Sequence, residues 1–172
     1  MYRAVVSWMF VSILLTTALS AASAQAAVLT YDADTGAAGA QDGAGAGWDT
    51  TNASVWDGAA NVVGPAAGTD EAVFGAGSGT AGTVAVGTIS AGAITFNTPG
   101  SGAYTLSGGA ITLDGTAPTI AANVNATIVS DLAGTGGLTK SGAGVLTLSG
   151  TLAYTGDTVV DGGTLVLNKG GT

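Results

Sequence analysis

Two aspartates, Asp114 and Asp131, are the residues whose type and spacing could support chemistry. They directly follow two equivalent triplets, residues 111–113 and 128–130, and are themselves 17 residues apart. In a solenoid with coils of that length, the two carboxylates would lie about 5 Å apart, which suits a retaining glycosidase or a shared cation. Solvated turn residues are the alternative, because Asp favours turns. We therefore predict no catalytic residue and no metal site, and keep this pair as a weak candidate for a cation.

Two tryptophans and three aspartates in the first third of the chain could also bind ligands. Trp48 and Trp56 could stack on the apolar face of a sugar, or they could cap the first coil of a repeat protein, and we expect the cap. Asp32, Asp34 and Asp42 suggest a Ca²⁺ loop, but the third acid and the Glu at the twelfth position are missing. We interpret these acids as solvated turn residues.

The composition excludes several classes of chemistry. The 172-residue chain has no Cys and no His, which rules out disulfides, thiolate metal sites, the usual Zn ligand sets and Ser-His or Cys-His nucleophiles. The net charge is −8, and Lys140 and Lys169 are the basic side chains beyond residue 26. Phosphate binding needs clustered Lys and Arg, so we expect no nucleic-acid partner. We also expect no cofactor and no enzymatic activity.

Residues 1–26 have the pattern of a secretory signal peptide, called the leader below. Arg3 precedes a mostly apolar run that ends at Leu19, and Ala24-Gln25-Ala26 forms an A-x-A cleavage site. A second A-x-A pattern lies two residues upstream. We expect cleavage between Ala26 and Ala27, with an uncleaved anchor as the alternative. If uncleaved, the segment would form an isolated helix at the N-terminus.

The sequence pattern around the candidate aspartates and tryptophans is one of short strands. This pattern predicts an all-β fold. Apolar triplets begin 17 to 19 residues apart, and each places two side chains on one face of a strand. A coil of 17–20 residues suits a parallel β-helix, with an antiparallel β-sandwich as the alternative. The residues expected to point inward are Ile94, Phe96, Ile111, Leu113, Ile128, Leu146, Leu148, Leu165 and Leu167. The expected outward ladder is Thr95, Thr112, Val129, Thr147 and Val166.

The chain after the leader divides into two parts. Residues 27–82 hold strand candidates at Val28–Tyr31 and Asp70–Phe74 around a Gly- and Ala-rich stretch that predicts a long loop. We expect this part to be a capping region that contains both tryptophans. Residues 83–172 are expected to form the β-helical repeats.

The best-formed repeat spans residues 137–168 and reads GLTKSGAGVLTLSGTLAYTGDTVVDGGTLVLN. Glycines separate its strand-like runs, at corners where a chain often needs a positive φ. Such a unit has little core of its own and must pack against a neighbouring repeat to bury its apolar side chains. We expect Lys140 and Asp157 to lie at solvated corners.

This stretch resembles the autotransporter-associated β-strand repeat, also called the passenger-associated transport repeat. Ala153 and Asp157 depart from the usual pattern. The resemblance implies a right-handed β-helix in a large secreted or surface protein of a Gram-negative-type bacterium, and it implies no catalytic residue. The matching residues are Gly137, Leu138, Thr139, Lys140, Gly142, Gly144, Leu146, Leu148, Gly150, Tyr154, Gly156, Thr158, Val160, Gly163 and Leu165.

We therefore expect an exported, non-catalytic β-helical segment of an autotransporter-like passenger or surface adhesion protein. It would assist passenger folding or act as a stalk. Its expected partners are the outer-membrane translocation machinery, further repeats of a longer chain, and a surface glycan or protein. Two alternatives stay open: a carbohydrate-binding or carbohydrate-active β-helix, and a truncated fragment without independent function.

Overall fold

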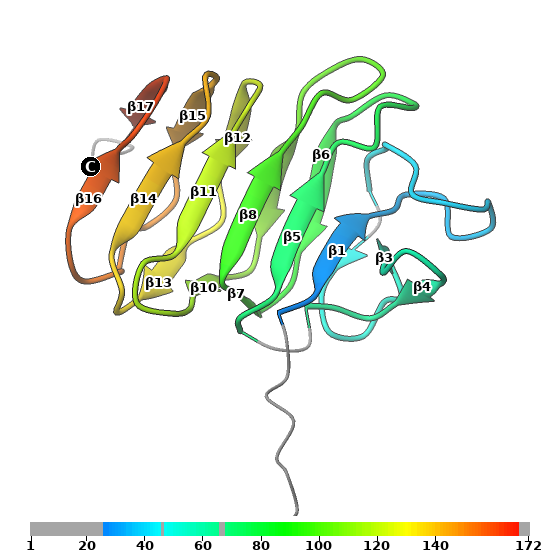
Figure 1. Ribbon diagram of the computed structural model, residues 1–172, viewed down its shortest axis with the longest axis horizontal. Coiled ribbons are helices and arrows are strands. Elements are labelled where there is room, and N and C mark those ends of the chain that lie inside the picture. Colours follow the sequence, from blue (N-terminus) through cyan, green and yellow to red (C-terminus); the bar gives the residue numbers. More distant parts are fainter. Residues whose placement is uncertain (1–25, 46, 66–67, 169–172) are drawn as a thin grey trace, which may run out of the picture.

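The computed structural model describes residues 26–45, 47–65 and 68–168, and every helix or strand element within these ranges is a β-strand (Figure 1). The predicted leader lies outside the described residues except for Ala26. Among the described residues, no helix could cross a membrane.

Three sheets enclose one core. The long sheet has the strand order β16-β14-β11-β8-β5-β1-β3-β4, the six-stranded sheet β17-β15-β12-β9-β6-β2, and the three-stranded sheet β13-β10-β7. The strands of the long sheet are β1 (Val28–Tyr31), β3 (Val55–Trp56), β4 (Asn61–Val62), β5 (Glu71–Phe74), β8 (Ala93–Phe96), β11 (Thr119–Ala122), β14 (Leu138–Ser141) and β16 (Thr158–Val160). Those of the six-stranded sheet are β2 (Gly47–Trp48), β6 (Thr83–Val86), β9 (Thr105–Gly108), β12 (Ala126–Ile128), β15 (Val145–Leu148) and β17 (Thr164–Leu167). The three-stranded sheet contains β7 (Ile89–Ala91), β10 (Ile111–Leu113) and β13 (Leu132–Gly134).

From β5 to β14 the chain visits the long, the six-stranded and the three-stranded sheet in turn, and then starts the next coil. Between β15 and β16 the third face of the described stack has a single bridge, from Leu152 to Leu132. Strands from successive coils pair in parallel, so the molecule is a β-solenoid of about four turns. The successive coils lie side by side in Figure 1. The prediction of a stacked parallel architecture is confirmed, and the β-sandwich alternative is wrong.

The predicted coil length of 17–20 residues holds for the last coils and is wrong for the earlier ones. In the long sheet the paired residues are 22 positions apart between Ala72 and Ile94, 26 between Ile94 and Ile120, and 20 from there to Lys140 and again to Val160. The 17-residue spacing connects different faces of the solenoid, because each face needs the same alternation of apolar and polar side chains. Spacing alone therefore does not identify which strands are neighbours.

The inward and outward faces were nevertheless assigned correctly for most residues. Phe96, Ile111 and Leu146 are fully buried, whereas Leu167 is 50% exposed at the C-terminal end of the stack. The outward threonine ladder shares only Thr147 and Val166 with the expected one. Register in the six-stranded sheet aligns Thr83, Thr105, Thr127 and Thr147, followed by Val166.

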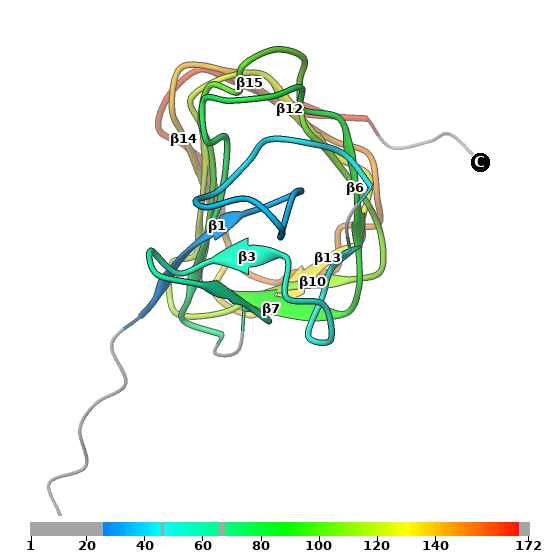
Figure 2. The same ribbon diagram turned by 90° about the vertical axis from the view of Figure 1, so that its right-hand side faces the viewer.

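Five buried aromatic rings fill the N-terminal end of the core. Phe74 lies at their centre, with ring centroids 5.0 Å from Trp48, 5.4 Å from both Tyr31 and Phe96, and 5.5 Å from Tyr104. Strands β3 and β4 continue the long sheet in antiparallel fashion beyond β1. Figure 2 looks onto this end and shows β3 and the preceding blue and cyan loops drawn across the opening of the coils.

Candidate functional site

The structure separates Asp114 and Asp131, so their carboxylates do not meet as the 17-residue spacing would allow. Ile111 pairs with Leu132, which places Asp131 just before one strand and Asp114 just after its neighbour. Each carboxylate accepts a backbone hydrogen bond, Asp131 from the nitrogen of Thr151 at 2.8 Å and Asp114 from its successor, Gly115, at 2.8 Å. Asp114 thus stabilises its own corner, whereas Asp131 joins its corner to Thr151 in the next coil. Neither residue supports the glycosidase geometry.

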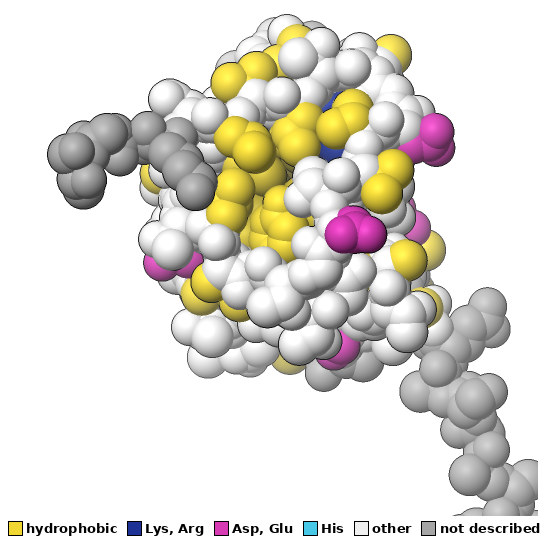
Figure 3. All heavy atoms as spheres, turned by 90° about the vertical axis from the view of Figure 1, so that its left-hand side faces the viewer, with side chains coloured by type: hydrophobic (Ala, Val, Ile, Leu, Met, Phe, Trp, Pro, Cys, Tyr) yellow, Lys and Arg dark blue, Asp and Glu magenta, His cyan; other side chains and the backbone are white. Residues whose placement is uncertain are grey.

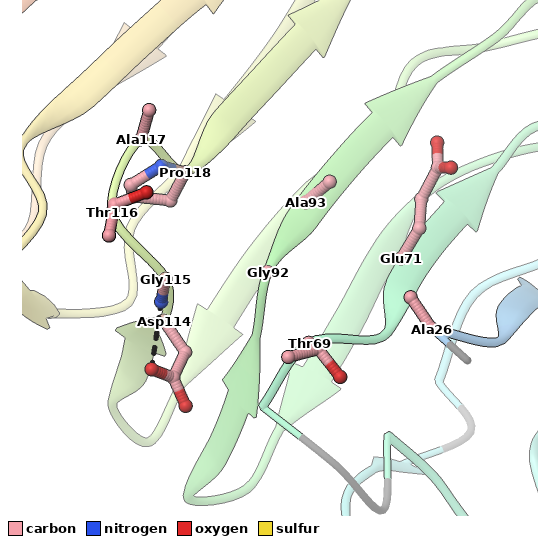
Figure 4. A pocket seen from close by; sticks show the side chains of 10 residues that line it. All are labelled: Ala26, Thr69, Glu71, Gly92, Ala93, Asp114, Gly115, Thr116, Ala117 and Pro118. Carbon is pink, nitrogen blue, oxygen red and sulfur yellow. Dashed lines mark hydrogen bonds between the residues drawn. The ribbon is translucent and has the colours of Figure 1, made fainter. Parts of the chain in front are cut away.

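A hollow of about 380 Å³ lies beside Asp114, at the corner between the three-stranded and long sheets. In Figure 4, Glu71 and Asp114 lie apart on its two sides. Glu71 accepts a hydrogen bond from the Thr95 hydroxyl at 2.6 Å. None of the residues that line the hollow is aromatic or basic, so it offers neither a ring for a sugar nor a cation for an acidic group. The lining residues are Ala26, Thr69, Glu71, Gly92, Ala93, Asp114, Gly115, Thr116, Ala117 and Pro118.

The two tryptophans differ in burial. Trp48 is fully buried against Phe74, and Trp56 is half-buried in β3. The aspartate that follows each tryptophan forms a local turn instead. Hydrogen bonds from the hydroxyl and backbone nitrogen of Thr51 lower the pKa of Asp49 to about 2, and backbone hydrogen bonds also lower the pKa of Asp57. Trp48 therefore presents no exposed ring to a sugar, and a capping role for both tryptophans stays a prediction.

The stretch from Gly137 to Asn168 forms the last two coils of the described stack. Its strands β14 and β15 pair with β16 and β17. Tight corners join them, and two corner glycines have positive φ, 78° at Gly142 and 59° at Gly163. A Cβ on Gly163 would lie 2.4 Å from the carbonyl oxygen of Gly144, so the stacked corners admit no side chain there.

Lys140 is buried, so its expected position at a solvated corner is wrong. It occupies an inward position of the long sheet between Ile120 and Val160 and is 0% exposed. Burial lowers the pKa of its amino group. The Nζ atom donates to the carbonyl oxygens of Ser141 at 2.9 Å, Gly142 at 2.7 Å and Gly162 at 2.9 Å. Since Gly162 belongs to the following coil, this lysine joins two consecutive coils.

The C-terminal end surface consists of the edges of β16 and β17 together with the inward-facing Val160, Leu165 and Leu167. Within the described residues, no further strand covers these edges. Val160 and Leu167 are about half exposed, at 49% and 50%. Figure 3 looks onto this end and shows apolar side chains gathered at its centre. At this surface the inward-facing side chains of the last described coil are only partly buried, because no further coil packs on them within the described residues.

Comparison with known proteins assigns the repeat. Residues 138–167 match the family model described as Passenger-associated-transport-repeat. This stretch is a passenger-associated transport repeat. The chain is also 43% identical over 141 residues to the Adhesin BmaC autotransporter of Brucella suis biovar 1 (strain 1330). The alignment covers 78% of this chain but 4% of that relative's length. No solved structure matches the chain.

The passenger-associated transport repeat tolerates both of its departures because they fall on the surface. Ala153 and Asp157 are exposed. Their backbones keep the stacking contacts, since the nitrogen of Ala153 donates to Leu132 at 2.7 Å and the carbonyl of Asp157 accepts from Leu138 at 2.9 Å. The prediction that Asp157 lies at an exposed corner is confirmed.

Three aspartates near the N-terminal end are buried: Asp32, Asp42 and Asp70. The interpretation of Asp32 and Asp42 as solvated turn residues is therefore wrong. Asp42 accepts hydrogen bonds from the nitrogens of Ala76, Ser78 and Gly100 and, at 2.8 Å, from the hydroxyl of Tyr104. Burial and this carboxylate raise the pKa of Tyr104. Asp42 thus fastens the N-terminal loop to two coils, a role that turn propensity does not reveal.

Asp70, the third of these aspartates, directly precedes β5 and is 5% exposed. Its Oδ1 accepts a hydrogen bond from the backbone nitrogen of Ala27 at 2.9 Å. Ala27 is the residue predicted to follow the leader cleavage site. The sequence contained both residues, but nothing in their spacing indicated that they meet.

Proposed function

We propose that the chain is an exported, non-catalytic β-helical segment of an autotransporter passenger or surface adhesin, and that its coils form a stalk or assist passenger folding. The observation that carries this proposal is the C-terminal end surface. Its parallel strand edges and exposed apolar side chains fit another coil of the same cross-section. The passenger-associated transport repeat at this end and the match to a small part of a long autotransporter adhesin support the same function.

Within this proposal the two ends of the solenoid have different roles. The N-terminal end, with its antiparallel strands and buried Trp48, acts as the cap. The C-terminal end surface receives the next repeat of a longer chain, which folds onto it as the passenger leaves the outer-membrane translocation machinery. Each new coil is templated by backbone hydrogen bonds from the coil before it. The adhesion target would be a surface glycan or protein bound elsewhere along the passenger.

A surface-display experiment tests the proposal. The full chain with its own leader is placed ahead of an autotransporter translocator that lacks its passenger, and protease resistance is measured on intact bacteria. We expect the wild-type segment to reach the surface as a resistant fragment. Leu146→Asp, which places a charge in the core of the repeat, should lower the amount of this fragment several-fold.

Thr147→Asp is the matched control, because Thr147 lies next to Leu146 on β15 but faces outward. It should leave the amount of resistant fragment unchanged. Retention of the wild-type segment inside the cell would contradict export. Equal surface yields for Leu146→Asp and Thr147→Asp would contradict a role of the folded repeat in display.

A further inference from the structure

The first strand begins with two contacts between its leading residue and β5. The Ala27 nitrogen donates to Oδ1 of Asp70 at 2.9 Å, and the Ala27 carbonyl accepts from the nitrogen of Glu71 at 2.8 Å. The parallel pairing of Val28 with Glu71 follows directly. The register of β1 is thus set at the residue that the leader's A-x-A pattern predicts as the new N-terminus.

The residues on the two sides of this contact differ in exposure to solvent. Ala26 and Ala27 are exposed, so the peptide bond between them is open to the solvent. Asp70 is nearly buried, and its carbonyl accepts a 2.9 Å hydrogen bond from Gly92 in the next coil. A buried carboxylate is costly unless it is paired and hydrogen-bonded, and here it faces a backbone nitrogen that export would convert into a cation.

We propose that removal of the leader after Ala26 creates an ion pair between the Ala27 α-ammonium and Asp70, and that this pair fixes the start of the first coil. The inference rests on the proposed function, because it requires export. A peptidase of the export machinery adds one water across the Ala26–Ala27 bond. The C–N bond breaks, the leader departs with a carboxylate on Ala26, and the Ala27 nitrogen becomes an ammonium with three protons.

The new charge strengthens an interaction whose geometry already exists. A free α-amino group has a pKa of about 7.7–8.0, so it is largely protonated at neutral pH. The hydrogen bond to the carboxylate already has one ionised partner, and the ammonium adds a direct attraction between opposite charges. Glu71 and Asp114, which line the hollow beside Ala26 from its two sides, add two further acidic side chains near the N-terminus. They favour a cation at the N-terminus as well.

The same geometry discriminates between the two cleavage sites. Cleavage at the upstream A-x-A pattern would leave Gln25 and Ala26 ahead of Ala27. The nitrogen beside Asp70 would then remain a neutral amide, and the ammonium would lie two residues away. Only cleavage after Ala26 delivers the positive charge to the buried carboxylate.

The test compares two N-termini in the exported, naturally processed protein. One chain is unaltered, and the other carries Gly-Ser inserted after Ala26, which keeps the A-Q-A pattern but moves the ammonium away from Asp70. Asp70→Asn is introduced into both chains. Mass spectrometry of the intact proteins identifies the N-terminus of each. The readout is hydrogen exchange of the β1 amides. Asp161→Asn serves as the control, because it removes one exposed acid at the other end of the chain.

Asp70→Asn should lower the hydrogen-exchange protection of the β1 amides in both chains. We expect the loss to be about tenfold greater in the unaltered chain than in the Gly-Ser chain. Asp161→Asn should change protection less than twofold in both. The same loss from Asp70→Asn in both chains, or an exported protein that does not begin at Ala27, would overturn the inference and leave the proposed function standing. Failure of the wild-type chain to be exported would overturn both.

Discussion

Replacement of Lys140 by methionine tests whether this lysine joins consecutive coils. Lys140→Met keeps the length of the side chain but removes the donor to three carbonyl oxygens, those of Ser141, Gly142 and Gly162. Hydrogen bonds from a charged group contribute about 1.5–3 kcal/mol each, so the lower bound for three bonds is about 4–5 kcal/mol. Burial of the methionine methyl group returns about 1–2 kcal/mol. We expect a net loss of about 3 kcal/mol in the free energy of unfolding.

The loss should be unevenly distributed along the solenoid. Because one of the three bonds reaches Gly162, about 1.5 kcal/mol, or roughly tenfold in amide-exchange protection, should be lost in β16 and β17. Urea unfolding gives the total, and hydrogen exchange gives its distribution. Thr139→Met, at the outward neighbouring position of β14, is the control and should change stability by less than 1 kcal/mol. A Lys140→Met protein as stable as the wild type, with unchanged protection in the last coil, would refute the reasoning.

Three further substitutions address the other buried contacts. Asp42→Ala removes the acceptor of four hydrogen bonds and should cost about 3 kcal/mol or more in thermal or urea unfolding, whereas Asp57→Ala in an exposed turn should leave the unfolding midpoint nearly unchanged. Gly163→Ala should destabilise the protein more than Gly39→Ala, because both glycines have positive φ but only Gly163 has backbone within reach of a new Cβ; equal losses in urea unfolding would contradict this. Since the pKa of Tyr104 is raised on folding, its contribution to stability should be complete below about pH 10 and fall at higher pH. Tyr104→Phe should be less stable at neutral pH and should lack that alkaline loss when unfolding is measured from pH 8 to 11.

The alternation of side chains was enough to predict the fold class and most of the core. Inward positions such as Ile111 and Leu146 follow from the two-residue period of a strand. The coil length did not follow, because the corners vary: the coil from Ile94 to Ile120 is longer than its neighbours. Lysine is rarely buried, so the position of Lys140 could not be predicted without the corner carbonyls that surround it. The meeting of Asp70 with Ala27 depends on a register that only the folded coils define.

The distribution of core side chains along the axis indicates where the solenoid is strongest. Large rings, including Trp48 and Phe74, fill the N-terminal end, and Asp42 ties the adjacent loop to two coils. At the other end, β16 and β17 have one neighbouring strand each within the described sheets, and Leu167 is half exposed. In a stacked repeat each coil is stabilised mainly by its neighbours, so local opening should begin at β17 and proceed toward the N-terminus. A further coil on the C-terminal end surface would bury Val160 and Leu167, and local opening would then begin in that added coil. Each added repeat therefore stabilises the repeat before it.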